Sequence, residues 1–523
     1  MDRRSLFKMI GAFAGASVMY RAMTELGHAG ESGYTGPLQL SHNPHGTTVL
    51  ILGAGMAGMC AAYELRKAGY QVKILEYNDR PGGRNWSLYG GDTYTELGGA
   101  TQKVQFDQGL YINPGPWRIP YHHYALLDYC KLLRIPLEPF MQVNYASYVH
   151  SASAFGGKPQ RFRALQADFN GYLAELLAKA THQDKLSQPV TKEDREILLA
   201  ALQAWGALDE RYEYKKGVLS SERRGYLSDP AGGTTSEPVL SEPTPMRELL
   251  KSRLWGALTA AHIYDYQPTL FQPVGGMGVI GKAFGRELGP LIQYNAKVTE
   301  IVQNDQGVTV TYQDSKQGGP VQHANGQWCI CTIPASILSQ IPMNVGAPLK
   351  NAIDAIPYEA SVKVGLQFKR RFWEQDDRIY GGISFTDLPI AMIGYPNTGY
   401  QDDGPGVLLG AYMFGPEAYQ MTALPPDERV RRVVQWGNQI HPQYATEFQH
   451  GVAVAWHRVP WTLGCFGSWT EETRAKHYDN LCAIDGRVVL AGEHVSRLGG
   501  WQEGALLSAL DTVRRLHQRV MAS

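Results

Sequence analysis

A run of glycines near the start of the expected folded region, Gly53 to Gly58, could hold a nucleotide diphosphate. Its three glycines permit a tight turn, a close approach of the backbone to a pyrophosphate, and close packing of a helix on a strand. The run lies between an expected buried strand, Thr48 to Leu52, and an expected helix, Met56 to Ala68, whose first N–H groups would point at the phosphates. The next expected strand ends at Glu76, where a carboxylate can accept hydrogen bonds from a ribose. The pattern predicts a Rossmann-type site with contacts from Gly53, Gly55, Met56, Ala57, Gly58 and Glu76.

A second glycine loop, Arg-Pro-Gly-Gly-Arg at residues 80–84, follows directly. Two arginines flank a segment with little side-chain bulk, so the loop can fold over a pyrophosphate and donate charge-assisted hydrogen bonds. We expect Arg84 to contact the same nucleotide. The alternative is an exposed basic turn without a ligand.

With these motifs, and with Ala491-Gly492-Glu493 late in the chain, the sequence resembles the flavin amine oxidase family from Thr47 to its end. In that family the late Glu meets the ribityl chain of the flavin, so the resemblance implies FAD rather than NAD. Many members attach the flavin through a Cys close to the final helix. Residues 497–501 contain none, and we therefore expect noncovalent FAD. The resemblance adds these cofactor contacts: Gly98, Gly99, Ala100, Val298, Gly492, Glu493 and Trp501.

The segment from Gly115 to Pro120 indicates the class of substrate. It resembles the motif with which L-amino acid oxidases present an arginine, here Arg118, to the substrate carboxylate. A guanidinium suits a carboxylate because it can donate two parallel hydrogen bonds and stays charged at any working pH. The stretch from Ala100 to Pro114 is an insertion relative to the usual spacing. The alternative for Arg118 is a structural ion pair.

Four more residues of the expected substrate site come from the same resemblance. Lys363, in an expected strand over 361–368, matches the lysine that holds a water near flavin N5, and we predict it to be catalytic. Tyr395 matches the cage tyrosine, Gly500 the glycine whose carbonyl accepts from the substrate amine, and Trp501 the second aromatic wall. Taken singly, such residues are more often edge charges or partly buried core.

The resemblance implies oxidative deamination of a free L-amino acid with an apolar or aromatic side chain. The products would be a 2-oxo acid, ammonia and hydrogen peroxide, with dioxygen as electron acceptor. Residues alone leave three alternatives open: a monoamine or polyamine oxidase, an amino acid monooxygenase or carrier-linked dehydrogenase, and a flavin-binding scaffold without turnover. No catalytic base can be named: His262 is a candidate, although a packing or surface role is the alternative for it. The pair His122-His123 follows the arginine motif and could line the entrance of the site.

Composition narrows the partners to small molecules. Lys plus Arg and Asp plus Glu both total 49, so no net basic field attracts nucleic acid. The six cysteines form no CxxC pair, and no metal-ligand spacing is evident, so we predict neither a disulfide framework nor a metal site. Cys329 and Cys331 are expected to pack within a strand.

The fold class expected is α/β with mixed α+β parts: a Rossmann-type FAD domain made of discontinuous segments, a mixed-sheet substrate domain and a helical insertion. We place the FAD domain at 47–105, 268–345 and 455–523, the substrate domain at 106–150 and 346–454, and the helical domain at 151–267. Residues 31–46 read as a linker. By the family resemblance a homodimer is expected.

The first 30 residues resemble a twin-arginine export signal. Arg3 and Arg4 precede an apolar run, Met9 to Tyr20, which is too short to span a bilayer. This predicts a periplasmic or secreted protein. The alternative is a cytoplasmic protein that keeps the segment.

Overall fold

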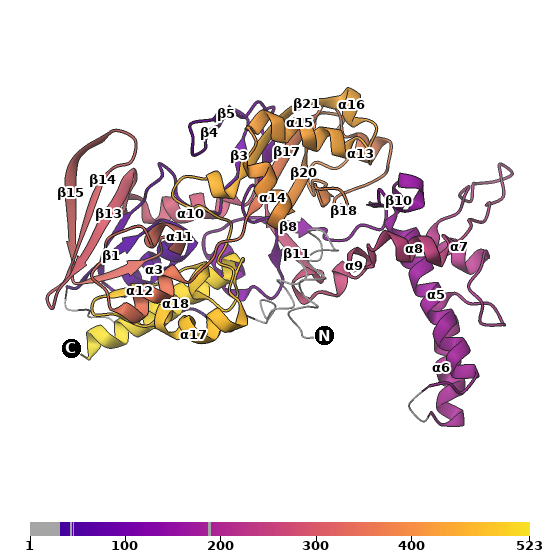
Figure 1. Cartoon of the computed structure of the whole chain (residues 1–523), viewed down its shortest axis with the longest axis horizontal. Coiled ribbons are helices and arrows are strands. Elements are labelled where there is room, and N and C mark those ends of the chain that lie inside the picture. The colour runs from indigo at the N-terminus through magenta and orange to yellow at the C-terminus, as the bar shows by residue number, and fades with distance from the viewer. Residues whose placement is uncertain (1–31, 42–43, 45, 187–189, 523) are drawn as a thin grey trace.

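A computed structural model describes residues 32–41, 44, 46–186 and 190–522. The predicted export segment lies outside these residues. Two sheet-based parts form the body of the molecule, and a helical arm projects from one side (Figure 1). Within the described ranges, no helix is long and apolar enough to cross a membrane. The predicted fold class is confirmed, while the predicted domain boundaries stay predictions.

A five-stranded parallel sheet forms the centre of the first part, in the order β12-β2-β1-β16-β22. Its strands are rich in Val, Ile, Leu and Cys because both faces of the sheet are buried. Cys329 and Cys331 are fully buried in β16, as predicted. The strands are β12 (Ile292–Gln293), β2 (Gln71–Leu75), β1 (Thr48–Leu52), β16 (Trp328–Cys331) and β22 (Val488–Leu490).

Two helices that start at the carboxyl ends of strands cover this sheet. Helix α3 (Met56–Lys67) follows β1, and α18 (Gln502–Met521) follows β22 and packs on α3. Ala and Gly dominate the start of α3, which lets it approach the strands closely. An antiparallel sheet, β13-β14-β15, extends from the same part (Figure 1). It comprises β13 (Ala296–Gln303), β14 (Val308–Asp314) and β15 (Gly318–Gly326), of which β15 is largely exposed and begins with two glycines.

A seven-stranded mixed sheet forms the second part, in the order β10-β9-β18-β19-β20-β17-β21. Every residue of β17 is buried, because helices pack on one face of the sheet and residues that connect to the first part cover the other face. The strands are β9 (Tyr148–His150), β10 (Gln160–Arg161), β17 (Ser361–Phe368), β18 (Ile383–Thr386), β19 (Met392–Gly394), β20 (Gly406–Phe414) and β21 (Phe448–Ala455). Associated helices are α13 (Phe372–Gln375), α14 (Gly415–Thr422), α15 (Pro426–Gly437) and α16 (Tyr444–Glu447).

The projecting arm is built by α5 (Phe162–His182), α6 (Lys192–Gly206) and α7 (Val218–Arg224), as Figure 1 shows. It lies within residues 151–267, the range predicted as a helical domain. The segment after α7 leads to α8 (Met246–Ser252) and α9 (Trp255–Leu258).

Short elements connect the two sheet-based parts and carry Arg118. Strand β7 (Ile119–Pro120) pairs with β11 (Leu270–Pro273), which also pairs with β8 (Leu137–Phe140). Helix α4 (Tyr124–Leu132) begins four residues after β7. The other elements are β3 (Leu88–Tyr89), β4 (Thr93–Thr95), β5 (Thr101–Lys103), β6 (Tyr111–Ile112), α10 (Gly278–Leu288), α11 (Ala335–Leu338), α12 (Ala347–Asp354) and α17 (Glu471–Cys482).

Candidate active site

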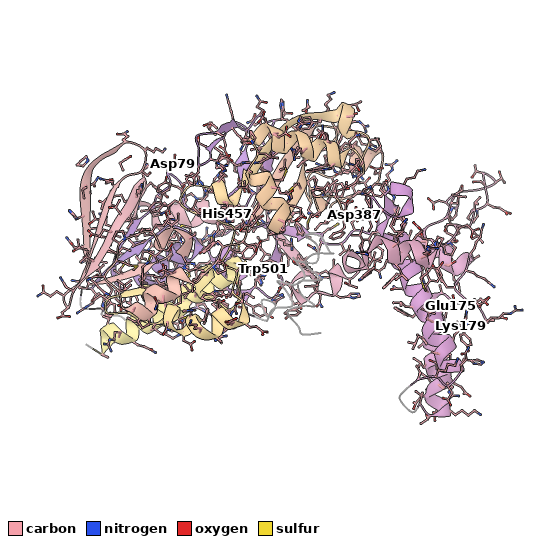
Figure 2. The ribbon with its side chains drawn as sticks, in the orientation of Figure 1. Asp79, Glu175, Lys179, Asp387, His457 and Trp501 are labelled. Atoms are coloured by element: carbon pink, nitrogen blue, oxygen red, sulfur yellow. The ribbon has the colours of Figure 1, made fainter. Side chains whose placement is uncertain are left out.

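A single large cavity is lined by residues of both sheet-based parts. It runs from the turn after β1 to the segment before α18, and Trp501 lies near the middle of the molecule (Figure 2). Twelve of the predicted site residues line it: Gly53, Gly55, Met56, Ala57, Glu76, Arg84, Arg118, Val298, Gly492, Glu493, Gly500 and Trp501. Six others are described but are not part of its wall: Gly58, Gly98, Gly99, Ala100, Lys363 and Tyr395.

At one end of the cavity, glycines bring backbone close to backbone. A Cβ added to Gly58 would lie 2.0 Å from the carbonyl oxygen of Gly53, and a Cβ added to Gly53 would lie 2.7 Å from Thr332 Oγ1. Around Gly55, by contrast, an added Cβ would meet nothing within 4 Å among the described atoms. Gly58 therefore packs the helix on the turn, while Gly55 borders open space.

Glu76 is buried beside this turn and holds it in shape. Its Oε2 accepts from the backbone N–H of Ala54 at 2.6 Å, and its Oε1 accepts from the N–H and side-chain amide of Asn78 at 2.8 and 2.7 Å. Burial raises the pKa of Glu76, although these hydrogen bonds oppose the shift. The carboxylate both shapes the nucleotide turn and borders the cavity, where a ribose can donate to it.

An ion pair joins the loop at residues 80–84 to the late Gly-Glu pair. Arg84 Nη1 donates to Glu493 Oε2 and to the carbonyl of Cys465, both at 2.8 Å. Glu493 Oε1 accepts from the N–H of Gly500 at 2.8 Å. Three segments far apart in sequence are thus held together along the cavity wall.

The cavity suits an elongated dinucleotide with an anionic middle. Helices α3 and α18 both begin at its wall, and neither has a side-chain cap on its first N–H groups. Uncapped helix N-termini favour negative charge and offer N–H donors to phosphates. The open face of Gly55 gives one of these termini an unobstructed approach. The residues present therefore fit FAD.

At the other end of the cavity, aromatic rings surround one arginine. Arg118 is 4% exposed. Its guanidinium carbon lies 4.5 Å from the ring centre of Tyr266 and 5.7 Å from that of Trp501. Tyr412 and Phe414, from β20, complete this aromatic wall. Such rings hold the guanidinium in place while leaving it charged.

Lys363 lies directly behind this wall. Its Nζ donates to the carbonyl of Gly115 and, at 3.3 Å, to the carbonyl of Asn113, and it lies 4.2 Å from the ring centre of Tyr412. Burial lowers the pKa of Lys363 from 10.5 to about 7. The side chain can therefore exist in either protonation state near neutral pH.

The prediction that Tyr395 forms the aromatic cage is wrong in this structure. Tyr395 is fully buried in the core of the seven-stranded sheet, where its hydroxyl shares hydrogen bonds with Ser384 Oγ at 2.7 Å and His441 Nε2 at 2.6 Å. Tyr412 borders the cavity instead. Lys363 and Tyr412 are paired in register across β17 and β20 and so lie on the same face of the sheet. Side chains alternate between the two faces of a strand, so the position of Tyr412 within residues 406–414 was the feature of the sequence that could have identified it.

The predicted cofactor contacts at Gly98, Gly99 and Ala100 are also displaced. These residues connect β4 to β5, and the two glycines are exposed. Gly115 takes the position beside the loop at residues 80–84: a Cβ added there would lie 1.9 Å from the carbonyl oxygen of Arg84. The expected insertion contains β5 and β6, which moves the Gly98-Gly99 pair away from the cavity.

Cys465 is a cavity residue that was not predicted, because only residues 497–501 were considered for covalent attachment of the flavin. Cys465 lines the cavity, and burial raises the pKa of its thiol to about 12. The expectation of noncovalent FAD considered only residues 497–501, so it remains a prediction. His262, the weak candidate base, is not part of the described cavity wall, whereas His123 is.

Comparison with known proteins agrees with this geometry. Residues 56–517 match the family model for flavin-containing amine oxidoreductases. L-amino-acid oxidases of Siganus canaliculatus and Crotalus adamanteus are each 27% identical to this chain. The alignments cover 91% and 90% of this chain, respectively, and 87% of each relative. Cyclohexylamine oxidase from Brevibacterium oxydans IH-35A has a similar fold, with a TM-score of 0.59 at 16% identity, over 91% of this chain and 99% of that one.

The chain belongs to the flavin-containing amine oxidoreductase family, as its sequence motifs predicted. It is an oxidoreductase, and its cofactor is FAD, which the glycine turn, Glu76 and the two uncapped helices are suited to hold.

Proposed function

We propose that this protein is an L-amino acid oxidase, and that Arg118 binds the substrate carboxylate. The observation that carries the proposal is a buried guanidinium, 4% exposed, at the aromatic end of the FAD cavity. A planar carboxylate matches a guanidinium in shape and charge and can accept two parallel hydrogen bonds from it. The two relatives named as L-amino-acid oxidases support the same substrate class.

Positioning is the main task of the residues around Arg118. The guanidinium would fix one end of the substrate, and Trp501 and Tyr412 would hold its α-carbon between two aromatic walls. The carbonyl of Gly500 would accept from the α-amine. Bound FAD would supply the acceptor for a hydride from the α-carbon and the route by which two electrons, with two protons, reach dioxygen to give hydrogen peroxide. Water then converts the released imino acid to a 2-oxo acid and ammonia.

Lys363, which lies behind the aromatic wall, would hold a water molecule or transfer a proton. Its Nζ is anchored by two carbonyls from the segment that carries Arg118. Because burial brings the pKa of Lys363 to about 7, the amine can give or take a proton at neutral pH.

A small neighbouring pocket supports the expected preference for an apolar or aromatic side chain. It shares Arg118 and Tyr266 with the main cavity. The rest of its wall is mostly apolar and includes Ile383, Phe385 and Met392. A substrate held at Arg118 could place its side chain there, where hydrophobic burial would stabilise it.

The arm gives a physical reason for the expected homodimer. Leu173, Leu176 and Leu177 lie on one face of α5 and are 42%, 54% and 40% exposed. Apolar residues at this spacing on a projecting helix favour burial against a partner, here a second copy. Light scattering would test this, and Leu176→Glu is expected to give monomers.

The proposal also includes export through the segment that contains Arg3 and Arg4. Cell fractionation of the full chain and of Arg3→Lys/Arg4→Lys would test it, with the variant expected to stay in the cytoplasm.

The proposed activity is tested by anaerobic mixing with a panel of L-amino acids while the flavin band at about 450 nm is followed. We expect L-phenylalanine or L-leucine to bleach the band, and air to restore it with formation of peroxide and the 2-oxo acid. A yellow protein that no amino acid bleaches would contradict the proposal.

A further inference from the structure

Three polar side chains beside Arg118 are buried together without serving the proposed reaction. His122 and His123 immediately precede α4, and Asp265 lies 142 residues beyond His123, in the short helical turn Tyr264–Tyr266. Their exposed fractions are 0%, 1% and 1%. His123 and Asp265 also line the main cavity.

None of the six nitrogen and oxygen atoms of these side chains has a hydrogen-bond partner within the described ranges. Buried polar atoms are almost always satisfied, because each unmet group costs about 1–3 kcal/mol. A pair formed by protonated His122 and Asp265 would leave both ring nitrogens of His123 without a partner. The cluster as a whole therefore points to a ligand that accepts lone pairs from all three residues.

The geometry of the cluster matches a transition-metal ion. One ligand atom from each residue lies within 4.8 Å of the others. His122 Nε2 and Asp265 Oδ1 are 3.3 Å apart. That separation equals the edge of a tetrahedron with bonds of about 2.0 Å, the length typical of Zn–N and Zn–O. The ring centres of the two imidazoles are 5.0 Å apart, and the rings are nearly perpendicular, at 86°.

We propose that His122, His123 and Asp265 form a site for a divalent transition-metal ion of the Zn²⁺ type. Two imidazoles and one carboxylate suit Zn²⁺ better than Mg²⁺ or Ca²⁺, which prefer oxygen ligands. Three protein ligands leave a fourth position for water, and the side on which His123 and Asp265 border the cavity is the one where it would open. The site is independent of whether Arg118 binds a carboxylate.

Metal analysis of the FAD-loaded protein tests the site. The protein is treated with chelator, dialysed against Zn²⁺ and analysed for bound zinc and melting temperature. We expect one equivalent of Zn²⁺ and a rise in melting temperature, since an ion that binds only the folded state stabilises it. Asp265→Asn and His122→Gln should each weaken binding by at least ~10–100-fold, the loss typical of even outer-sphere partners.

A matched control and a second measurement make the test decisive. His457→Gln removes an imidazole that is not part of the cluster and should leave the zinc content unchanged. X-ray absorption of the zinc-loaded wild type should report two imidazoles and oxygen ligands, a readout that needs no variant to fold. A wild type that binds no zinc, a site with sulfur ligands, or full binding by correctly folded Asp265→Asn and His122→Gln would overturn the proposal.

Discussion

The two ends of the cavity are built in different ways. At the nucleotide end, contacts come mostly from backbone, and the decisive feature of Gly53, Gly55 and Gly58 is the side chain they lack. At the aromatic end, the wall is made by side chains such as those of Arg118 and Tyr412, which come from segments far apart in the chain. Local sequence therefore determines the first end, whereas tertiary packing determines the second.

The largest effect is expected from Arg118→Ala. Removing one partner of a buried charge pair costs about 2–5 kcal/mol, so kcat/KM for L-phenylalanine should fall roughly 30- to 4000-fold. Steady-state peroxide assays would measure this. Arg118→Lys keeps the charge but loses the forked pair of donors, so its kcat/KM should lie between those of the wild type and Arg118→Ala. Equal activity of all three proteins would remove the carboxylate-binding role of Arg118.

A comparable effect on the cofactor is expected from Gly58→Val. The added Cβ would lie 2.0 Å from the carbonyl oxygen of Gly53, so the nucleotide turn must shift. We expect about 100-fold weaker FAD binding, or about 2.7 kcal/mol, measured by flavin fluorescence during dilution. Gly232→Ala, where an added Cβ meets nothing within 4 Å, is the control. Unchanged FAD affinity in Gly58→Val would contradict the assignment of this turn.

The two ends of the cavity also differ in how much of each could be predicted from the sequence. The glycine turn and Glu76 form one βαβ unit of about 30 residues, where spacing alone implies geometry. Choosing between Tyr395 and Tyr412 required knowing which face of a sheet each occupies, and that depends on pairing with β17. Gly98 was misplaced because a local insertion shifts the register. The cluster with Asp265 joins distant segments, so no sequence spacing reveals it.

Lys363 should make stability depend on pH. Its pKa is lowered by burial to about 7, whereas the unfolded chain keeps the lysine protonated up to about pH 10.5. Unfolding therefore takes up a proton between these values, and the folded state gains stability as pH rises through this window. Relative to Lys363→Met, the wild type should gain about 1.4 kcal/mol per pH unit, measured by denaturant unfolding. Parallel pH profiles would contradict a buried neutral lysine.

A smaller effect distinguishes the two tyrosines. Tyr412→Phe should lower kcat/KM by about 5- to 10-fold if its hydroxyl assists substrate binding, the equivalent of one hydrogen bond. Tyr395→Phe should leave kcat/KM unchanged and lower the unfolding free energy by about 1–3 kcal/mol, because Ser384 and His441 lose a buried partner. The reverse pattern would restore Tyr395 to the active site.

No covalent flavin is expected at Cys465, so acid precipitation should release all the flavin into the supernatant. Cys465→Ser serves as the matched control and should behave identically. A yellow wild-type pellet together with a colourless Cys465→Ser pellet would show that the thiol is attached to the flavin.

Selection of a carboxylate by Arg118 can be measured with two substrates that differ only in that group. L-phenylalanine and phenethylamine are mixed anaerobically with the wild type, and the rate of flavin bleaching is followed for each. We expect L-phenylalanine to bleach the flavin at least ~30-fold faster at equal low concentration, since only it pairs with the buried guanidinium. Equal or faster bleaching by phenethylamine would rule out a carboxylate-binding role of Arg118 and identify the protein as an oxidase of simple amines.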